Sequence, residues 1–216
     1  MQELIRRFLL RKLAIFVAGL AVLFSTQFAS AQLSTEQHVD FFIGGGTLLS
    51  SSPSSSSGNQ LPSEKGGAYI NLGGDGVFLP HSLGINVETA WRATQGVYAP
   101  GAINYRPILT DFNLLYQPRL GKKIGLDLMG GIGAASTRYY SPGPSSPGVA
   151  NYVSSDHFME HLAGGIRYYV WHHLFVRPEI HYYHIQNNNT VQDLGFSSNN
   201  VFRVGASVGY TLGGGD

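Results

Sequence analysis

Polar and apolar residues alternate along short segments of this chain, and this alternation restricts the fold more than any other feature of the sequence. Within residues 174–185, Arg177 and Glu179 alternate with Val176 and Ile180. Successive side chains of a β-strand point to opposite faces, so an extended segment with this pattern has one polar and one apolar face. The pattern therefore predicts a sheet that separates two different environments.

Eight segments share this period of two, and turn-rich stretches separate them. Three of the links between segments are short and four are long and polar, and the two kinds strictly alternate. This arrangement is typical of an antiparallel meander that crosses a membrane, with tight turns on one side and long loops on the other. We predict an all-β fold, an eight-stranded antiparallel up-and-down transmembrane β-barrel with both termini in the periplasm and four loops outside. The predicted strands are residues 38–49, 67–79, 83–94, 106–117, 124–137, 157–170, 174–185 and 200–212.

The start of the chain has the features of an export signal. A basic region containing Arg6 and Arg7 precedes an apolar run at residues 13–24, and Ala29-Ser30-Ala31 matches a small-residue cleavage site. The apolar run is shorter than the roughly 20 residues of a membrane-spanning helix. We predict a signal peptide over residues 1–31 and a single domain over residues 32–216.

The composition and the motifs argue against several classes of function. The formal net charge is +1, so nothing indicates nucleic-acid binding. The chain has no cysteine, so no disulfide stabilises it. The glycines at 44–46 are not followed by a phosphate-loop lysine, and the adjacent His172 and His173 lie in a tight turn that points them apart. We predict no cofactor, no metal and no catalytic residue.

The question that remains is which face of the strands points inward. The apolar face is nearly unbroken, and in water it would form a patch far larger than soluble monomers tolerate. We therefore predict that it contacts lipid, and that the polar face fills the barrel as a hydrogen-bonded plug, because a small barrel has room only for side chains. Glu160 falls on the apolar face of its segment. A β-bulge, which adds one residue to a strand, would shift the alternation and turn Glu160 to the polar face. The predicted interior polar network is Asp40, Glu88, Arg92, Asp111, Asp127, Arg167, Arg177, Glu179 and Arg203.

The chain resembles the small eight-stranded outer-membrane barrels of the OmpA/OmpX type, the outer membrane protein beta-barrel domain family. The residues that carry the resemblance are GGIRYYV at 164–170, LFVRPEIHYY at 174–183 and the closing segment VFRVGASVGYTL at 201–212. The resemblance implies location in the outer membrane, contact with its lipid and recognition by the outer-membrane assembly machinery. We predict a monomer with a non-enzymatic role, either structural or in surface interactions with an unknown ligand of the loops.

Two alternatives remain open from the sequence. Outer-membrane lipid A deacylases share this barrel and carry a His-x-Ser-Asn motif, which is similar to His184-Ile185-Gln186-Asn187. The nucleophilic serine is replaced by Gln186, whose amide cannot be activated by a histidine, and the only candidate acid is Asp193 in a loop. The second alternative is a soluble secreted β-barrel binding protein, which would have the apolar face inside.

Overall fold

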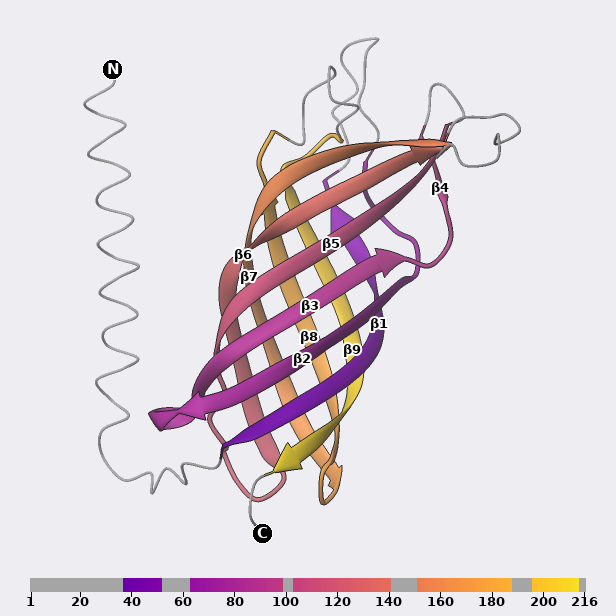
Figure 1. The fold of residues 1–216 in the computed structure, drawn as a ribbon. Coiled ribbons are helices and arrows are strands. Elements are labelled where there is room, and N and C mark those ends of the chain that lie inside the picture. Colours follow the sequence, from indigo (N-terminus) through magenta and orange to yellow (C-terminus); the bar gives the residue numbers. More distant parts are fainter. Residues whose placement is uncertain (1–36, 52–62, 99–102, 141–150, 188–195, 214–216) are drawn as a thin grey trace, which may run out of the picture. The chain divides into compact units, whose positions relative to one another are not determined.

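The protein forms a closed antiparallel β-barrel (Figure 1). The structure is a computed structural model that describes residues 37–51, 63–98, 103–140, 151–187 and 196–213. The predicted signal peptide, residues 1–31, and the loop residue Asp193 lie outside the described residues. Among the described residues, no helix is both long and apolar enough to span a membrane.

Eight strands form the barrel wall, and the pairing of β3 with β5 closes it. Every neighbouring pair is antiparallel, and a ninth short strand, β4, extends one edge of β5. The predicted all-β, eight-stranded antiparallel barrel is thereby confirmed. The strands are β1 (His38–Ser50), β2 (Tyr69–Leu79), β3 (Leu83–Arg92), β4 (Gly96–Tyr98), β5 (Ile103–Tyr116), β6 (Ile124–Tyr140), β7 (Tyr152–Trp171), β8 (Leu174–Ile185) and β9 (Asn200–Gly213).

The links between strands sort to the two ends of the barrel. Three short links lie at one end of the barrel: the 3-10 turn η2 (Pro80–Ser82), the β5–β6 link and the β7–β8 link. The first and last paired residues, His38 and Gly213, pair with each other and lie at the same end. We call this the turn end, and the opposite end the loop end (Figure 1). His81 and Ser82 adopt positive φ angles of 63° and 58°, which allows the chain to reverse within three residues.

Strands β5, β6 and β7 each extend at least three residues further toward the loop end than the sequence pattern predicted. Tyr140 of β6 pairs with Tyr152 of β7, so part of the link expected between residues 137 and 157 is a regular hairpin. Polar residues such as Ser154 and Asp156 obscured the alternation, although the pairing continues through them without a break. The register is also continuous through Glu160, so no bulge is present there, and its side chain lies exposed on the outer face.

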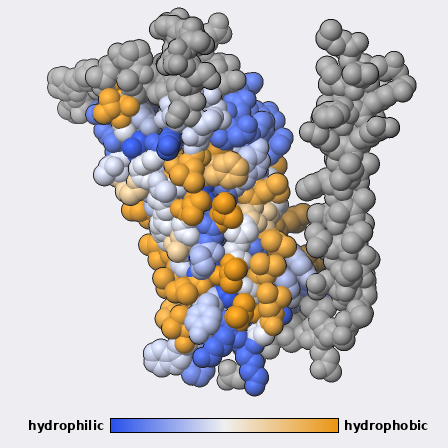
Figure 2. Space-filling view, turned by 180° about the vertical axis from the view of Figure 1, so that it is seen from behind, coloured by the Kyte–Doolittle hydropathy of each residue, from blue (hydrophilic) through white to orange (hydrophobic). Residues whose placement is uncertain are grey.

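Apolar side chains form a belt on the outside of the barrel (Figure 2). Leu114 is 74% exposed and Ile180 is 51% exposed, whereas Glu88, Arg177 and Arg203 are almost completely buried. This distribution is the reverse of a soluble barrel, which needs an apolar interior. The soluble alternative is therefore wrong, because so large an outward apolar surface requires a nonpolar surrounding. The most exposed members of the belt include Phe41, Ile43, Leu72, Phe112, Leu114, Ile132, Leu162, Ile166 and Ile180.

The height of this belt matches a membrane. On β6 the outward apolar positions run from Ile124 to Ala134, and the polar Ser136 follows. Ten residue steps at about 3.4 Å, in a strand tilted by about 40°, span roughly 26 Å along the barrel axis. Outer-membrane barrels present an apolar band of about 25 Å. The closed wall also leaves no strand edge unpaired within that height, as hydrocarbon requires.

Two leucines with similar exposure provide a test of the belt. We expect Leu114→Arg, which places a charge within the belt, to lower the free energy of unfolding by about 2–4 kcal/mol. Leu120 is 67% exposed but lies in the turn between β5 and β6, so Leu120→Arg changes stability by less than about 1 kcal/mol. Urea unfolding of the barrel in lipid vesicles measures both. Equal effects of the two substitutions would contradict a lipid-facing belt.

Candidate functional site: the polar barrel interior

Three arginines lie at the centre of the barrel and are among its largest fully buried side chains. Arg167 on β7, Arg177 on β8 and Arg203 on β9 are each no more than 1% exposed. Strand alternation directs all three inward, and neighbouring small residues leave room for them. A Cβ on Gly165, for example, would lie 3.1 Å from Cγ of Arg177.

Arg167 and Arg177 share two carboxylates. Asp75 Oδ2 lies 2.8 Å from Arg167 Nη2 and 3.0 Å from Arg177 Nη1, and Asp127 Oδ2 lies 3.0 Å and 3.1 Å from the same two atoms. Arg167 also forms an ion pair with Asp40. These pairs join β1, β2, β6, β7 and β8 across the lumen. Charge-assisted hydrogen bonds of this kind are among the strongest in proteins.

The two guanidinium groups also lie over aromatic rings. The Cζ of Arg167 is 3.9 Å from the centroid of the Phe175 ring, and that of Arg177 is 4.1 Å from the Phe42 ring. Both rings fit against glycines, because a Cβ on Gly73 would collide with Phe42 and one on Gly209 with Phe175. Paired large and small residues thus hold each arginine between carboxylates and an aromatic face.

Glu179 connects this group with Arg203. Its Oε2 accepts a hydrogen bond from Arg177 Nε at 2.8 Å, and its Oε1 lies 3.5 Å from Arg203 Nη2. Arg203 also forms an ion pair with Glu88 of β3 across the lumen. Asn71 donates to Glu179 Oε1 at 3.3 Å. The network therefore extends without interruption along the lumen.

A directed hydrogen-bond chain begins at Arg203. Since a guanidinium group only donates, its Nη2 must donate to His181 Nε2, which lies 2.7 Å away. The proton of His181 is then on Nδ1, which donates to His161 Nε2 at 3.0 Å. By the same logic His161 Nδ1 donates to Asn113 Oδ1 at 2.7 Å. Arg203 thus fixes the tautomers of two neutral, stacked histidines.

The chain continues through two amides to carboxylates. Asn113 Nδ2 donates to Asp111 Oδ1 at 2.6 Å and to Asn86 Oδ1 at 2.8 Å. Asn86 Nδ2 in turn donates to Asp75 Oδ1 at 2.6 Å, which returns the chain to the group around Arg167 and Arg177. Side-chain amides therefore donate hydrogen bonds to carboxylate oxygens that the arginines do not contact, and the imidazoles connect these amides to Arg203.

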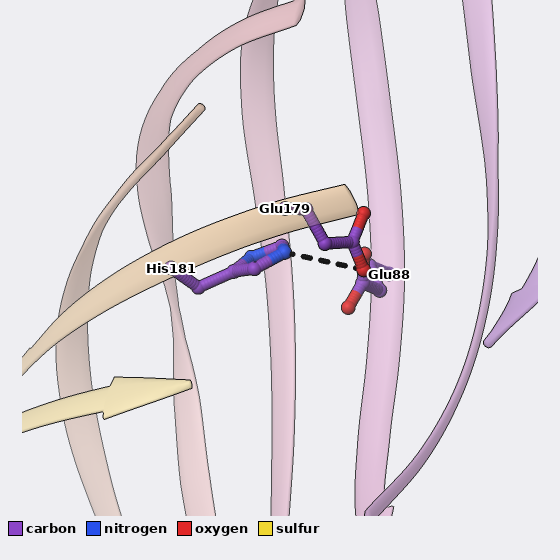
Figure 3. A group of neighbouring side chains, drawn as sticks. All are labelled: Glu88, Glu179 and His181. Atoms are coloured by element: carbon purple, nitrogen blue, oxygen red, sulfur yellow. Dashed lines mark ion pairs between the residues drawn. The ribbon is translucent and has the colours of Figure 1, made fainter. Parts of the chain in front are cut away.

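Glu88, Glu179 and His181 have the composition of a metal site, and their ligand atoms lie within 4.8 Å of one another (Figure 3). His181 Nε2 is 3.5 Å from Glu179 Oε1. Arg203 Nη2, however, contacts all three residues. The guanidinium group therefore takes the place that a cation would need, and a metal ion would have to displace it.

Apolar side chains close the polar layer on both sides. Toward the loop end lies a cluster of Leu48, Tyr69, Leu109, Ala135, Met159, Tyr183, Ile185 and Val201. Toward the turn end lie two smaller clusters, Phe42 with Tyr169 and Phe175, and Val77 with Leu115 and Met129. These clusters were not predicted from the sequence, although their residues share the inward parity of the charged positions. Excluding water on both sides strengthens the ion pairs between them.

Eight of the nine residues predicted for the interior polar network are buried and lie in this layer: Asp40, Glu88, Asp111, Asp127, Arg167, Arg177, Glu179 and Arg203. The ninth, Arg92, is half-buried at the loop end of β3, where its Nη1 donates to Tyr105 Oη at 2.8 Å. Its position at the end of the strand keeps it away from the central acids. Three central arginines thus face six buried acids, which include Asp75.

His184, the residue of the enzymatic alternative, lies on the outer face at the loop end of β8. Its Nδ1 is 2.9 Å from Asn200 Oδ1, and its strand partner on β7 is Glu160. Glu160 is thus an outward acid beside His184 that was not predicted from the sequence. The position of the serine nucleophile is still occupied by Gln186.

Comparison with known proteins agrees with this architecture. Residues 16–211 match the family described as outer membrane protein beta-barrel domain. No curated protein matches the sequence. Neisserial surface protein A is 12% identical with a TM-score of 0.55, and the alignment covers 81% of this chain and 96% of that one.

Two further solved structures share the fold. Ail of Yersinia pestis, in complex with the heparin analogue sucrose octasulfate, is 11% identical with a TM-score of 0.52, covering 82% of this chain and 98% of Ail. A major outer membrane protein of Thermus thermophilus is 11% identical with a TM-score of 0.51, covering 81% of this chain and 99% of that one. With the family match over most of its length, the closed barrel and the outward apolar belt, this chain belongs to the outer membrane protein beta-barrel domain family and is a protein of the outer membrane.

Proposed function

We propose that the protein is a non-enzymatic, monomeric outer-membrane barrel with a plugged polar interior, which presents four long loops to the outside of the cell. Its role is structural, or it binds a surface ligand through those loops. The observation that carries the proposal is the combination of an outward apolar belt with a lumen occupied along its length by ion pairs and apolar clusters.

The plug follows from the energetics of the buried charges. Each central arginine contacts at least two acids, and at least one of these contacts crosses the lumen to a strand that is not its neighbour. A water-filled pore would leave such side chains hydrated and separate. The orientation follows from topology, since the three short links and both ends of the barrel domain share one end, as in barrels inserted from the periplasm. Export by the signal peptide and insertion by the outer-membrane assembly machinery complete the proposal.

The loops are the part that differs most in chemistry from the barrel wall. They are rich in serine, proline, glycine and asparagine. Ail, which shares the fold, has been solved with a bound heparin analogue, so a barrel of this kind can bind a ligand. We therefore assign the interaction role to the loop end, and the stabilising role to the interior.

The plug predicts a strong effect of removing one buried cation. We expect Arg177→Met to lower the free energy of unfolding by about 3–5 kcal/mol, because Asp75, Asp127 and Glu179 lose a shared partner without being rehydrated. Urea unfolding in lipid vesicles measures this loss. Arg92→Met, outside the network, serves as the control and costs less than about 1.5 kcal/mol. The plug is refuted if the two variants unfold alike.

The orientation can be tested because the chain has no cysteine. Asn151 at the loop end and Lys122 at the turn end are both exposed, so a single cysteine at either position reports the compartment it faces. On intact cells, a membrane-impermeant maleimide should label Asn151→Cys and leave Lys122→Cys unlabelled until the cells are lysed. Labelling of Lys122→Cys alone on intact cells would mean that the barrel is inverted.

The enzymatic alternative has one feature in its favour, the outward position of Glu160 beside His184. We expect His184→Ala and Glu160→Gln to leave the acylation of lipid A unchanged, because position 186 provides no nucleophile. Mass spectrometry of lipid A from cells that express each variant or the wild type makes the comparison. If expression of the wild type removes an acyl chain and His184→Ala does not, the protein is an enzyme.

A further inference from the structure

Two arginines lie side by side on the outer wall of the barrel, just beyond the apolar belt. Arg106 of β5 and Arg138 of β6 are direct partners in the antiparallel register. Both have the outward parity of their strands and both are half-buried. Like charges directly opposite each other in a sheet destabilise it unless something neutralises them.

No carboxylate of the described residues forms an ion pair with either arginine. The nearest acid along this wall, Asp156, pairs in register with Ser136, two positions from Arg138. The neighbouring segments 99–102 and 141–150 contain no acidic residue in their sequence. The Nε of Arg106 is buried and has no hydrogen-bond partner. Arg106 therefore has an unused donor, and neither arginine has an ion-pair partner among the described residues.

The surroundings hold one of the two guanidinium groups in place. The Cζ of Arg138 is 4.8 Å from the centroid of the Tyr152 ring, and the Tyr152 and Tyr140 rings are 5.9 Å apart. Aromatic residues of this kind mark the membrane–water interface of outer-membrane barrels. A guanidinium held against a ring keeps its planar donors available for a second partner.

The height of the pair indicates what that partner is. Arg138 is four residues beyond Ala134, the last apolar outward position of β6, which corresponds to roughly 10 Å along the barrel axis. The headgroup layer extends about 5–7 Å beyond the hydrocarbon. On β5, however, the apolar Ile108 faces outward only two residues from Arg106, which corresponds to roughly 5 Å along the barrel axis, so the pair reaches the headgroup layer from this strand.

We propose that Arg106 and Arg138 form a binding site for the phosphate group of an anionic lipid in the outer leaflet, such as a phosphorylated glycolipid. The site is on the lipid-facing wall and is separate from the lumen and from the loops. Two neighbouring guanidinium groups, each with planar donors, match the oxygens of a phosphate. The inference rests on the proposed orientation, which assigns the loop end to the outer leaflet.

The test measures how much lipid A stays bound to the full-length barrel extracted in mild detergent, using native mass spectrometry. We expect Arg106→Gln/Arg138→Gln to retain bis-phosphorylated lipid A with an affinity at least about tenfold below that of the wild type. Lys122→Gln/Lys123→Gln removes the same charge at the turn end and retains it like the wild type. Heat-modifiable migration on a gel verifies that each variant is folded, and Arg106→Lys/Arg138→Lys retains an intermediate amount.

Two further arms identify the ligand chemistry. Dephosphorylated lipid A should bind the wild type and the double glutamine variant equally, because the arginines recognise the phosphate. Inorganic pyrophosphate should compete only weakly, because it lacks the acyl chains that pack on the belt. Equal retention of bis-phosphorylated lipid A by the wild type and the double glutamine variant, or displacement by pyrophosphate at the lipid concentration, overturns the site. The cysteine-labelling experiment is independent of this result, so a failure of the orientation and a failure of the site are distinguishable.

Discussion

The absence of water in the bilayer interior is the constraint on which the rest of the structure depends. Every backbone polar group must be paired within the protein at that depth, which requires a closed sheet. Charged side chains within the belt are therefore directed inward, with the exception of Glu160, which lies on the outer face. The β3–β5 pairing closes the wall, and strand alternation then directs Arg167, Arg177 and Arg203 into the lumen. An unpaired charge would be very costly there, so the network that crosses the barrel is a consequence of the belt outside it.

The lumen is organised in layers along the barrel axis. Apolar clusters at both ends enclose a polar layer in which Asp75, Asp127 and Glu179 each contact more than one arginine. Within this layer, imidazoles and amides carry hydrogen bonds from one carboxylate group to the next, and the direction of those bonds is set by Arg203. The polar layer thus links strands across the lumen, whereas the outer wall carries the arginine pair and the loop end carries the long polar links.

The alternation of residues was sufficient to predict the architecture, and for β8 even its bounds. It was less informative where the outer face turns polar, so the extensions of β6 and β7 and the outward Glu160 were missed or left unexplained. The alternation also could not predict how far along the barrel axis each inward residue lies. Arg92 has the correct parity but sits at the loop end, whereas His161 and His181 share the parity and complete the network. Parity determines the face, but only three-dimensional register determines which inward residues meet.

Fluorescence quenching by brominated lipids tests the inside–outside assignment most directly. In a background where Trp91 and Trp171 are replaced by phenylalanine, a single tryptophan at Leu114 should be strongly quenched by lipids brominated along their acyl chains. A single tryptophan at Tyr183, inside the lumen and 0% exposed, should be quenched little. The opposite ranking, with position 183 quenched and position 114 protected, would contradict the account.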